Sequence, residues 1–164
     1  MSRPNVFAEG PYDAEAEQMR IRSLFVAKRA GAQELGASVH ELLPGSPGFH
    51  LHAHYGMEEL FVVLSGRPTL RTAGGEEELA PGDVVSMPRG LEGLHTFANR
   101  TEEPARVLAI STLPVPEVVL YPELGKFGVA TRDPFAPVSE GGDAGVVGLF
   151  DLPAPREPLE KPDI

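Results

Sequence analysis

Three histidines and one glutamate stand at spacings that suit the binding of one divalent metal ion. His52 and His54 are two positions apart, Glu59 follows five positions later, and His95 comes after a gap that fits two strands and their turns. Imidazole nitrogens and carboxylate oxygens are both good ligands for first-row transition ions. In a strand, residues two apart point to the same face, so His52 and His54 project together. The sequence therefore predicts a metal site with these four ligands.

The residues near these ligands predict an apolar pocket. Phe61 and Val63 share the strand face of Glu59, and Phe97 shares the face of His95. Apolar walls exclude water and strengthen electrostatic interactions at an ion. We therefore expect a small molecule to be held against the metal between these side chains.

Other histidine and acidic residues are candidates for lesser roles. His50 has the parity of the two nearby ligand histidines and is a candidate pocket residue, although a polar residue at the strand's entry is the simpler interpretation. His40, a lone histidine beside Glu41, is interpreted as structural or exposed. No catalytic residue is predicted, and the candidates for a general base are Glu58, His50 and Tyr55.

The ligand types limit the chemistry of the site. Three neutral imidazoles and one carboxylate give a divalent ion a net charge of about +1, and an octahedral ion keeps two positions for an oxygen ligand such as a hydroxy acid, enediol or catechol. Iron could bind substrate and dioxygen there, whereas manganese, zinc or nickel would act as a Lewis acid for isomerisation, decarboxylation or hydrolysis. The ligands predict one divalent transition metal, Fe, Mn, Zn or Ni, without choosing among them.

Composition limits the partners of the chain. Its 164 residues suffice for one domain, and 41% of them are hydrophobic, as in a globular protein. The formal net charge of −10 argues against nucleic acid and against an anionic membrane, because both require a basic surface. Neither a secretory signal, a membrane span nor a cysteine is found. We therefore expect a cytoplasmic protein that binds a small molecule.

Glycine and proline are abundant, with 18 and 17 residues, and the apolar segments between them are short. This pattern is typical of an all-β sandwich or barrel. Strands are predicted at 35–43, 49–55, 58–65, 68–73, 76–79, 83–87, 94–99 and 105–112. Residues 13–20 are predicted to form an acidic helical turn and 21–28 a strand, with one helix through both segments as the alternative.

The sequence changes in character after Leu113. The prolines that follow Leu113 predict an extended segment at a sheet edge, where a missing amide donor is tolerated. Residues 145–152 are apolar enough to dock on the barrel or on a neighbouring subunit, and the proline-spaced tail is predicted to be mobile. The predicted organisation is an N-terminal extension at 1–20, a barrel with its trailing segment at 21–130, and a loop, docking segment and tail at 131–164.

The first group of ligands lies in a motif that resembles the first motif of the cupin superfamily. His52-Ala53-His54 is followed by four residues, Glu59, six residues and Gly66, as in that motif. Glu58 would be the ligand under a variant with three intervening residues, but the six residues before Gly66 favour Glu59. Ser46 stands where the family motif has glycine.

A second segment resembles the second cupin motif. Gly82 is followed by five residues and Pro88-Arg89-Gly90, and His95 is followed by three residues and Asn99. The chain departs from the motif in having four residues rather than two between Gly90 and His95. We interpret this insertion as an expanded turn. A register shift by one residue would instead point His95 outward and leave three ligands.

The resemblance implies a jelly-roll barrel, or double-stranded β-helix, that holds a metal ion, as in small bacterial single-domain cupins. Cupins include dioxygenases, isomerases, decarboxylases, storage proteins and ligand-sensing domains, so the resemblance implies fold and site more than reaction. The leading hypothesis is a metal-dependent enzyme for a small organic acid, sugar or aromatic substrate. The alternatives are a non-catalytic metal-dependent binding or sensing module and a purely structural barrel. We expect a homodimer, because a second copy can bury exposed sheet edges.

Overall fold

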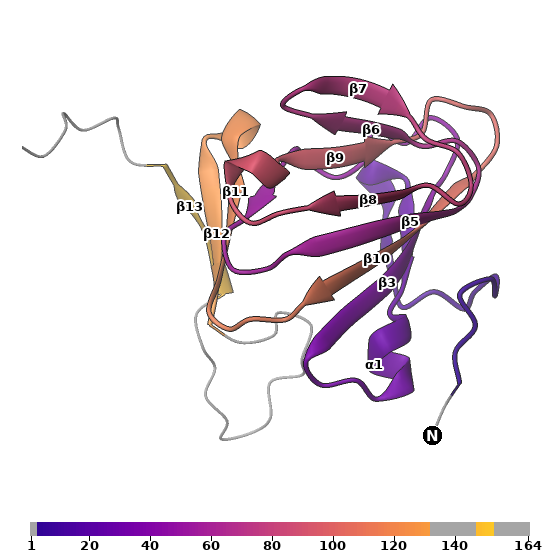
Figure 1. Ribbon diagram of the computed structural model, residues 1–164, viewed down its shortest axis with the longest axis horizontal. Helices are drawn as coiled ribbons and strands as arrows, with labels where there is room; N and C mark the ends of the chain where they lie inside the picture. Colours follow the sequence, from indigo (N-terminus) through magenta and orange to yellow (C-terminus); the bar gives the residue numbers. More distant parts are fainter. Residues whose placement is uncertain (1–2, 132–146, 153–164) are drawn as a thin grey trace, which may run out of the picture.

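The chain folds as an all-β jelly roll of antiparallel sheets in a computed structural model, which describes residues 3–131 and 147–152 (Figure 1). The largest sheet has six strands in the order β1-β2-β3-β10-β5-β8. These strands are β1 (Ala14–Ala16), β2 (Ile21–Leu24), β3 (Leu35–Leu42), β5 (Glu59–Ser65), β8 (Val84–Met87) and β10 (Ala105–Thr112). Strand β10 pairs with β3 on one side and β5 on the other, and so joins segments that are far apart in the sequence.

Two smaller sheets complete the fold. One has the order β7-β6-β9 and consists of β6 (Thr69–Thr72), β7 (Gly75–Glu78) and β9 (His95–Ala98). The other has the order β13-β12-β11-β4 and stands at one end of the barrel (Figure 1). Its strands are β4 (Ala53–His54), β11 (Glu117–Tyr121), β12 (Lys126–Ala130) and β13 (Val147–Asp151). The helical turns are η1 (Glu17–Met19), α1 (Val26–Ala30), η2 (Leu91–Gly93) and η3 (Pro122–Leu124).

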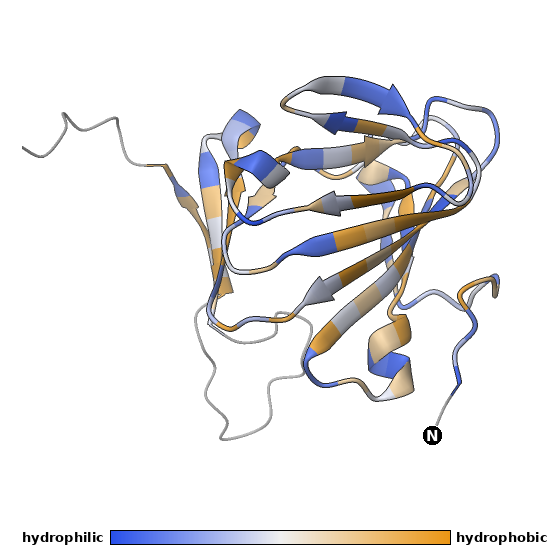
Figure 2. Ribbon diagram, viewed as in Figure 1, coloured by the Kyte–Doolittle hydropathy of each residue, from blue (hydrophilic) through white to orange (hydrophobic). Residues whose placement is uncertain are grey.

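The main hydrophobic core lies between the six-stranded and the three-stranded sheets. On β5, Phe61 and Val63 are buried, whereas Leu60 is 39% exposed, as expected for a strand with one face in the core. Figure 2 shows hydrophobic residues along β5 and β10, and hydrophilic residues on β7, whose side chains are all exposed. The core cluster consists of Ile21, Leu42, Phe61, Val63, Leu70, Leu79, Met87, Phe97, Val107 and Ala109.

The strand predicted at 21–28 ends at Leu24, and the chain then forms α1. Asp13 explains this correction. Its carboxylate accepts a hydrogen bond from the Phe25 amide at 2.7 Å and forms an ion pair with Arg29 at 3.0 Å, so it holds both the start and the last turn of the helix. Neither contact is local in sequence. The apolar run at 21–28 by itself therefore predicts a longer strand than the one that forms.

Two further predictions need correction. Residues 13–20 form β1 and η1 rather than one helical turn, and the alternative single helix is also wrong. Within 49–55, only β4 is a regular strand. The reason is that this segment passes between two sheets: the His52 backbone exchanges hydrogen bonds with His95 at the start of β9, whereas Ala53 and His54 pair with β11. The other predicted strands are confirmed to within one residue at each end.

The segment after Leu113 is extended, as predicted, but β11 is an inner strand between β12 and β4 rather than an edge. Pro116 precedes the strand and Pro122 follows it, so the prolines remove no donor from the ladder. The predicted docking segment forms β13 on β12, while residues 145 and 146 lie outside the described part. So do the predicted tail at 153–164 and, apart from Thr131, the predicted loop. No helix in 3–131 or 147–152 has the length and apolar character of a membrane span.

Candidate metal centre

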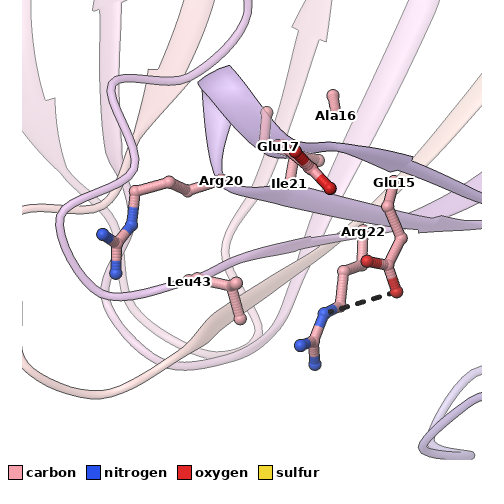
Figure 3. A pocket seen from close by; sticks show the side chains of 7 residues that line it. All are labelled: Glu15, Ala16, Glu17, Arg20, Ile21, Arg22 and Leu43. Atoms are coloured by element: carbon pink, nitrogen blue, oxygen red, sulfur yellow. Dashed lines mark ion pairs between the residues drawn. The ribbon is translucent and has the colours of Figure 1, made fainter.

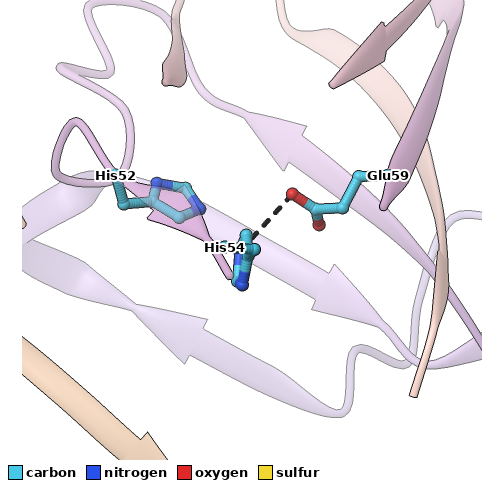
Figure 4. Close-up of side chains that lie close together, drawn as sticks. All are labelled: His52, His54 and Glu59. Atoms are coloured by element: carbon cyan, nitrogen blue, oxygen red, sulfur yellow. Dashed lines mark ion pairs between the residues drawn. The ribbon is translucent and has the colours of Figure 1, made fainter. Parts of the chain in front are cut away.

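The first three predicted ligands come together at the end of the barrel. The rings of His52 and His54 lie 4.9 Å apart and nearly perpendicular. The His54 Nε2 is 3.4 Å from the Glu59 Oε2, where β5 begins (Figure 4). One ligand atom from each of these three residues lies within 4.8 Å of the other two. The spacing of the H-x-H motif therefore produces a group able to hold a metal ion.

The fourth predicted ligand points inward. His95 begins β9, is only 2% exposed, and its Nε2 lies 3.4 Å from the Glu59 Oε2. Its ring is 4.6 Å from that of His52 but 6.5 Å from that of His54, and it lies outside the tightest group of three. The two additional residues of the turn are accommodated in η2, so the register shift that would turn His95 outward does not occur.

Gly93 at the end of η2 sets the position of His95. A Cβ on Gly93 would lie 1.9 Å from the carbonyl oxygen of Pro88, so no other residue fits without moving the turn. The Gly93 carbonyl also accepts a hydrogen bond from the His95 Nδ1 at 2.8 Å. The expanded turn therefore orients the imidazole as well as accommodating the inserted residues.

All three imidazoles have an oxygen acceptor at Nδ1. Because carbonyl and carboxylate oxygens only accept, Nδ1 carries the proton and the Nε2 lone pair is left for a metal. Metal-binding histidines have such outer partners as a rule. The pairs are His52 with the His50 carbonyl at 2.8 Å, His95 with the Gly93 carbonyl at 2.8 Å, and His54 with the Glu117 carboxylate at 3.3 Å.

Burial keeps two of these histidines uncharged. Desolvation, together with the neighbouring His95 and His54, lowers the pKa of His52 to about 3. Desolvation also lowers the pKa of His95 to about 4, against the opposite effect of its hydrogen bond to Gly93. Both rings are therefore neutral at pH 7, as metal binding requires.

The Glu59 carboxylate explains why a cation fits this site. Its Oε2 is buried and has no hydrogen-bond partner among the described residues, although two imidazole Nε2 atoms lie 3.4 Å away. Desolvation raises the pKa of Glu59, Glu117 raises it further, and His54 opposes the shift. With bonds of ~2.1 Å, neighbouring ligands of an octahedral ion lie about 3.0 Å apart, close to the spacing seen. The donor set thus fits a divalent transition ion.

Two of the four predicted pocket residues, Phe61 and Phe97, lie beside His95. Phe61 has its ring 5.0 Å from that of His95 and 4.8 Å from that of Phe97, and Val63 is buried in the same core cluster. The His50 side chain is exposed, contrary to its proposed place in the pocket. The reason is that His50 precedes the paired part of its segment and contributes its backbone carbonyl instead.

Two site residues were not predicted, and both come from β11. Glu117 is 5% exposed and contacts His54, and the Tyr121 ring stacks on that of His52 at 5.9 Å. Burial raises the pKa of Tyr121, which keeps its phenol protonated. The period-two pattern in E-V-V-L-Y placed both residues on one face, but only tertiary pairing shows which neighbour that face meets. The predicted base candidates, Glu58, His50 and Tyr55, are exposed.

A separate surface pocket lies beside the N-terminal hairpin and shares no residue with the histidine site (Figure 3). Within it, the Arg22 Nε is 3.8 Å from the Glu15 Oε1, and both side chains are largely exposed. Such ion pairs contribute little to stability. The lining residues are Glu15, Ala16, Glu17, Arg20, Ile21, Arg22 and Leu43.

Fold and site together define a jelly-roll barrel with a histidine and glutamate group that can hold a metal. Residues 38–111 match the family model described as Cupin domain. These residues therefore form a Cupin domain, and the trailing segment lies outside the matched part. No curated protein matches the sequence significantly.

Solved structures share this fold. A sugar phosphate isomerase of the cupin superfamily from Silicibacter pomeroyi is 26% identical, with 76% of this chain and 84% of that chain covered and a TM-score of 0.66. A protein proposed to be a sugar phosphate isomerase, from Acidithiobacillus ferrooxidans, is 24% identical, with 85% and 83% covered and a TM-score of 0.69. A polyketide cyclase from Streptomyces resistomycificus is 24% identical, with 57% and 65% covered and a TM-score of 0.51. The last two similarities establish the fold only.

Proposed function

We propose that the protein is a metal-dependent enzyme that binds one divalent transition ion through His52, His54, Glu59 and His95. One observation carries the proposal. The Nε2 atoms of His54 and His95 lie 3.4 Å from a buried carboxylate oxygen that has no hydrogen-bond partner among the described residues. Atoms that all accept hydrogen bonds gather in this way where a cation lies between them.

The surrounding residues suit a small substrate with oxygen donors. When bound, the ion would supply a Lewis acid, or with iron a place for dioxygen. Phe61 and Phe97 exclude water from one side of His95, which strengthens electrostatic interactions with a bound molecule. Tyr121 beside His52 keeps a protonated phenol, which makes its hydroxyl a hydrogen-bond donor at neutral pH.

Three reaction types fit this centre: dioxygenation, isomerisation and decarboxylation. We favour isomerisation of a small sugar or hydroxy acid. The support is the similarity to the Silicibacter pomeroyi protein, a sugar phosphate isomerase with 26% identity over 76% of this chain. A Lewis acid that polarises a carbonyl beside a hydroxyl is the chemistry that such an isomerisation needs.

A non-catalytic metal-dependent binding or sensing module is the second candidate. The observation that favours it concerns the groups able to transfer a proton. Glu58, His50 and Tyr55, the side chains outside the ligand set that were candidates for a general base, are all exposed. A binding module needs no group that transfers a proton.

Two measurements test the proposal. The metal content of protein purified without a metal-affinity tag should approach one ion per chain. Metal-loaded protein should then consume a member of a panel of hydroxy acids, sugars, sugar phosphates and enediols, followed by substrate loss and oxygen uptake. Tight binding of a panel member with no turnover by any metal form would favour the sensing module. Absence of bound metal under all conditions would contradict both functions.

We also propose that the chain forms a homodimer through the outer face of its C-terminal sheet. The strand register places five apolar side chains on this face of neighbouring strands, and no charged residue lies among them. Two copies of a chain with a formal net charge of −10 repel each other least where they meet through an uncharged face. A monomer in sedimentation at micromolar concentration would contradict the proposal. The face consists of Val118, Leu120, Phe127, Val129 and Phe150.

A further inference from the structure

Strand β11 lies beyond the segment that matches the family model, which ends at residue 111, yet it runs alongside the metal centre. It is antiparallel to β4, with Val119 opposite His54. Because alternate residues of a strand share a face, Glu117 and Tyr121 point to the same side as Val119. The trailing segment thus presents a carboxylate and a phenol to the histidines.

The Glu117 carboxylate is enclosed and makes few contacts. Its Oε1 accepts hydrogen bonds from the His54 Nδ1 at 3.3 Å and from the Gly56 amide at 3.4 Å. Its Oε2 is buried and has no hydrogen-bond partner among the described residues. A Cβ on Gly56 would lie 2.2 Å from that oxygen, so the chain has its smallest residue where the carboxylate passes. In the described chain, His54 is the ion-pair partner of Glu117.

We propose that Glu117 is a positioning residue of the metal centre that acts through His54. A carboxylate at Nδ1 fixes the proton there, holds the plane of the ring and aims Nε2 at the ion. Its full negative charge also makes the imidazole a stronger electron donor, which a neutral acceptor does less well. This inference rests on the proposed metal site.

The contrast among the three histidines supports this role. His52 and His95 each donate to a backbone carbonyl two residues away, so their orientation is set locally. His54 instead depends on a side chain 63 residues distant, delivered by the pairing of β11 with β4. The metal affinity of the domain therefore depends on a segment outside the part that defines the family.

Metal affinity of the full chain tests the proposal. Zinc binding to metal-free protein would be measured by competition with a chelating dye for the wild type, Glu117→Gln, Glu117→Ala and Glu123→Gln. We expect Glu117→Gln to weaken binding about tenfold and Glu117→Ala up to about 100-fold, as for other outer partners of metal ligands. Glu123→Gln is the matched control, because Glu123 lies on the same trailing segment, is exposed and pairs with Arg71.

Nitrogen NMR of the imidazoles in metal-free protein supplies a readout that a merely structural role would not change. The wild type should show His54 protonated at Nδ1. Glu117→Ala should lose this fixed tautomer, whereas His52 and His95 should keep theirs. Glu117→Gln should largely preserve it, because an amide oxygen still accepts. If Glu117→Ala does not fold, the isosteric Glu117→Gln still reports the loss of charge through zinc affinity.

Several results would overturn the inference. Wild-type zinc affinity in Glu117→Ala, or an unchanged His54 tautomer, would show that Glu117 does not position the ring. Complete loss of stoichiometric zinc in Glu117→Gln would make Glu117 a direct ligand instead. A wild type that binds no metal would refute the proposed function, and the NMR readout would then still decide whether Glu117 fixes His54.

Discussion

His52 and His95, in the candidate metal centre, and His40, in a second region, are alike in burial and in lowered pKa but differ in the partners of their rings. Desolvation lowers the pKa of His40 to about 4, as it does for His95. The His40 Nδ1, however, faces the Ser23 hydroxyl at 2.9 Å, and its ring meets Phe49 edge-on at 5.2 Å. A hydroxyl both donates and accepts, so it fixes no tautomer. Burial and a low pKa are thus common to both regions, and converging Nε2 atoms around a carboxylate distinguish the metal centre.

The largest expected effect concerns the ligands themselves. His52→Ala and Glu59→Ala should abolish stoichiometric metal, because each removes a donor from the group of three. His40→Ala should retain it, since His40 is not a member of that group. Elemental analysis of folded, dialysed protein measures all three variants. If His52→Ala and Glu59→Ala retained as much metal as His40→Ala, the assignment of the site would be refuted.

The second effect concerns the turn before His95. Gly93→Ala should weaken metal binding about 10- to 100-fold, because the added Cβ would meet the Pro88 carbonyl at 1.9 Å and displace the acceptor of the His95 ring. Gly74→Ala is the control, as its Cβ would only touch the Thr72 hydroxyl at 3.5 Å. Unchanged affinity in Gly93→Ala, measured by dye competition, would mean that His95 contributes no ligand.

The third effect is the acid sensitivity of the metal-free protein, to which both regions contribute. The unfolded chain protonates its histidines near pH 6.5, whereas folded His52, His95 and His40 do so at about 3, 4 and 4. Between these values the unfolded state binds more protons, so stability should fall with decreasing pH by up to about 1.4 kcal/mol per pH unit for each of the three rings. Glu59, whose pKa is raised, opposes part of this loss.

Denaturant unfolding in the presence of a chelator at pH 7, 6 and 5 measures that slope. His40→Gln should make the slope shallower while keeping all four proposed ligands, which separates most of the contribution of His40 from that of the metal centre. A free energy of unfolding that stays constant or rises on acidification would contradict the buried, neutral state of these rings.

The smallest expected effect is that of Glu59→Gln, which should raise the stability of the metal-free protein and lower its metal affinity. Glu59→Gln replaces a buried carboxylate oxygen without a partner by an amide, and should stabilise the metal-free protein by about 1 kcal/mol. The same change should weaken metal binding, because it removes the negative charge among the imidazoles. Glu58→Gln, at an exposed neighbour, should alter neither quantity. Thermal unfolding with and without zinc makes the comparison, and loss of stability in metal-free Glu59→Gln would count against the argument.

The sequence by itself determined the ligand types and most of the strands. Period-two alternation is a local property, so it correctly put Glu59, Phe61 and Val63 on one face and gave most strand bounds to within one residue. The spacing in H-A-H likewise brings His52 and His54 side by side without any knowledge of the fold.

Only the tertiary structure decided which outer groups complete the centre. His95 points inward because Gly93 lets η2 pack against Pro88, and His50 contributes its carbonyl because the strand pairing begins after it. Glu117 reaches His54 because β11 pairs with β4, although 63 residues separate the two side chains. Pairing between distant strands is set by backbone hydrogen bonds and packing across the whole barrel, and no local pattern encodes it.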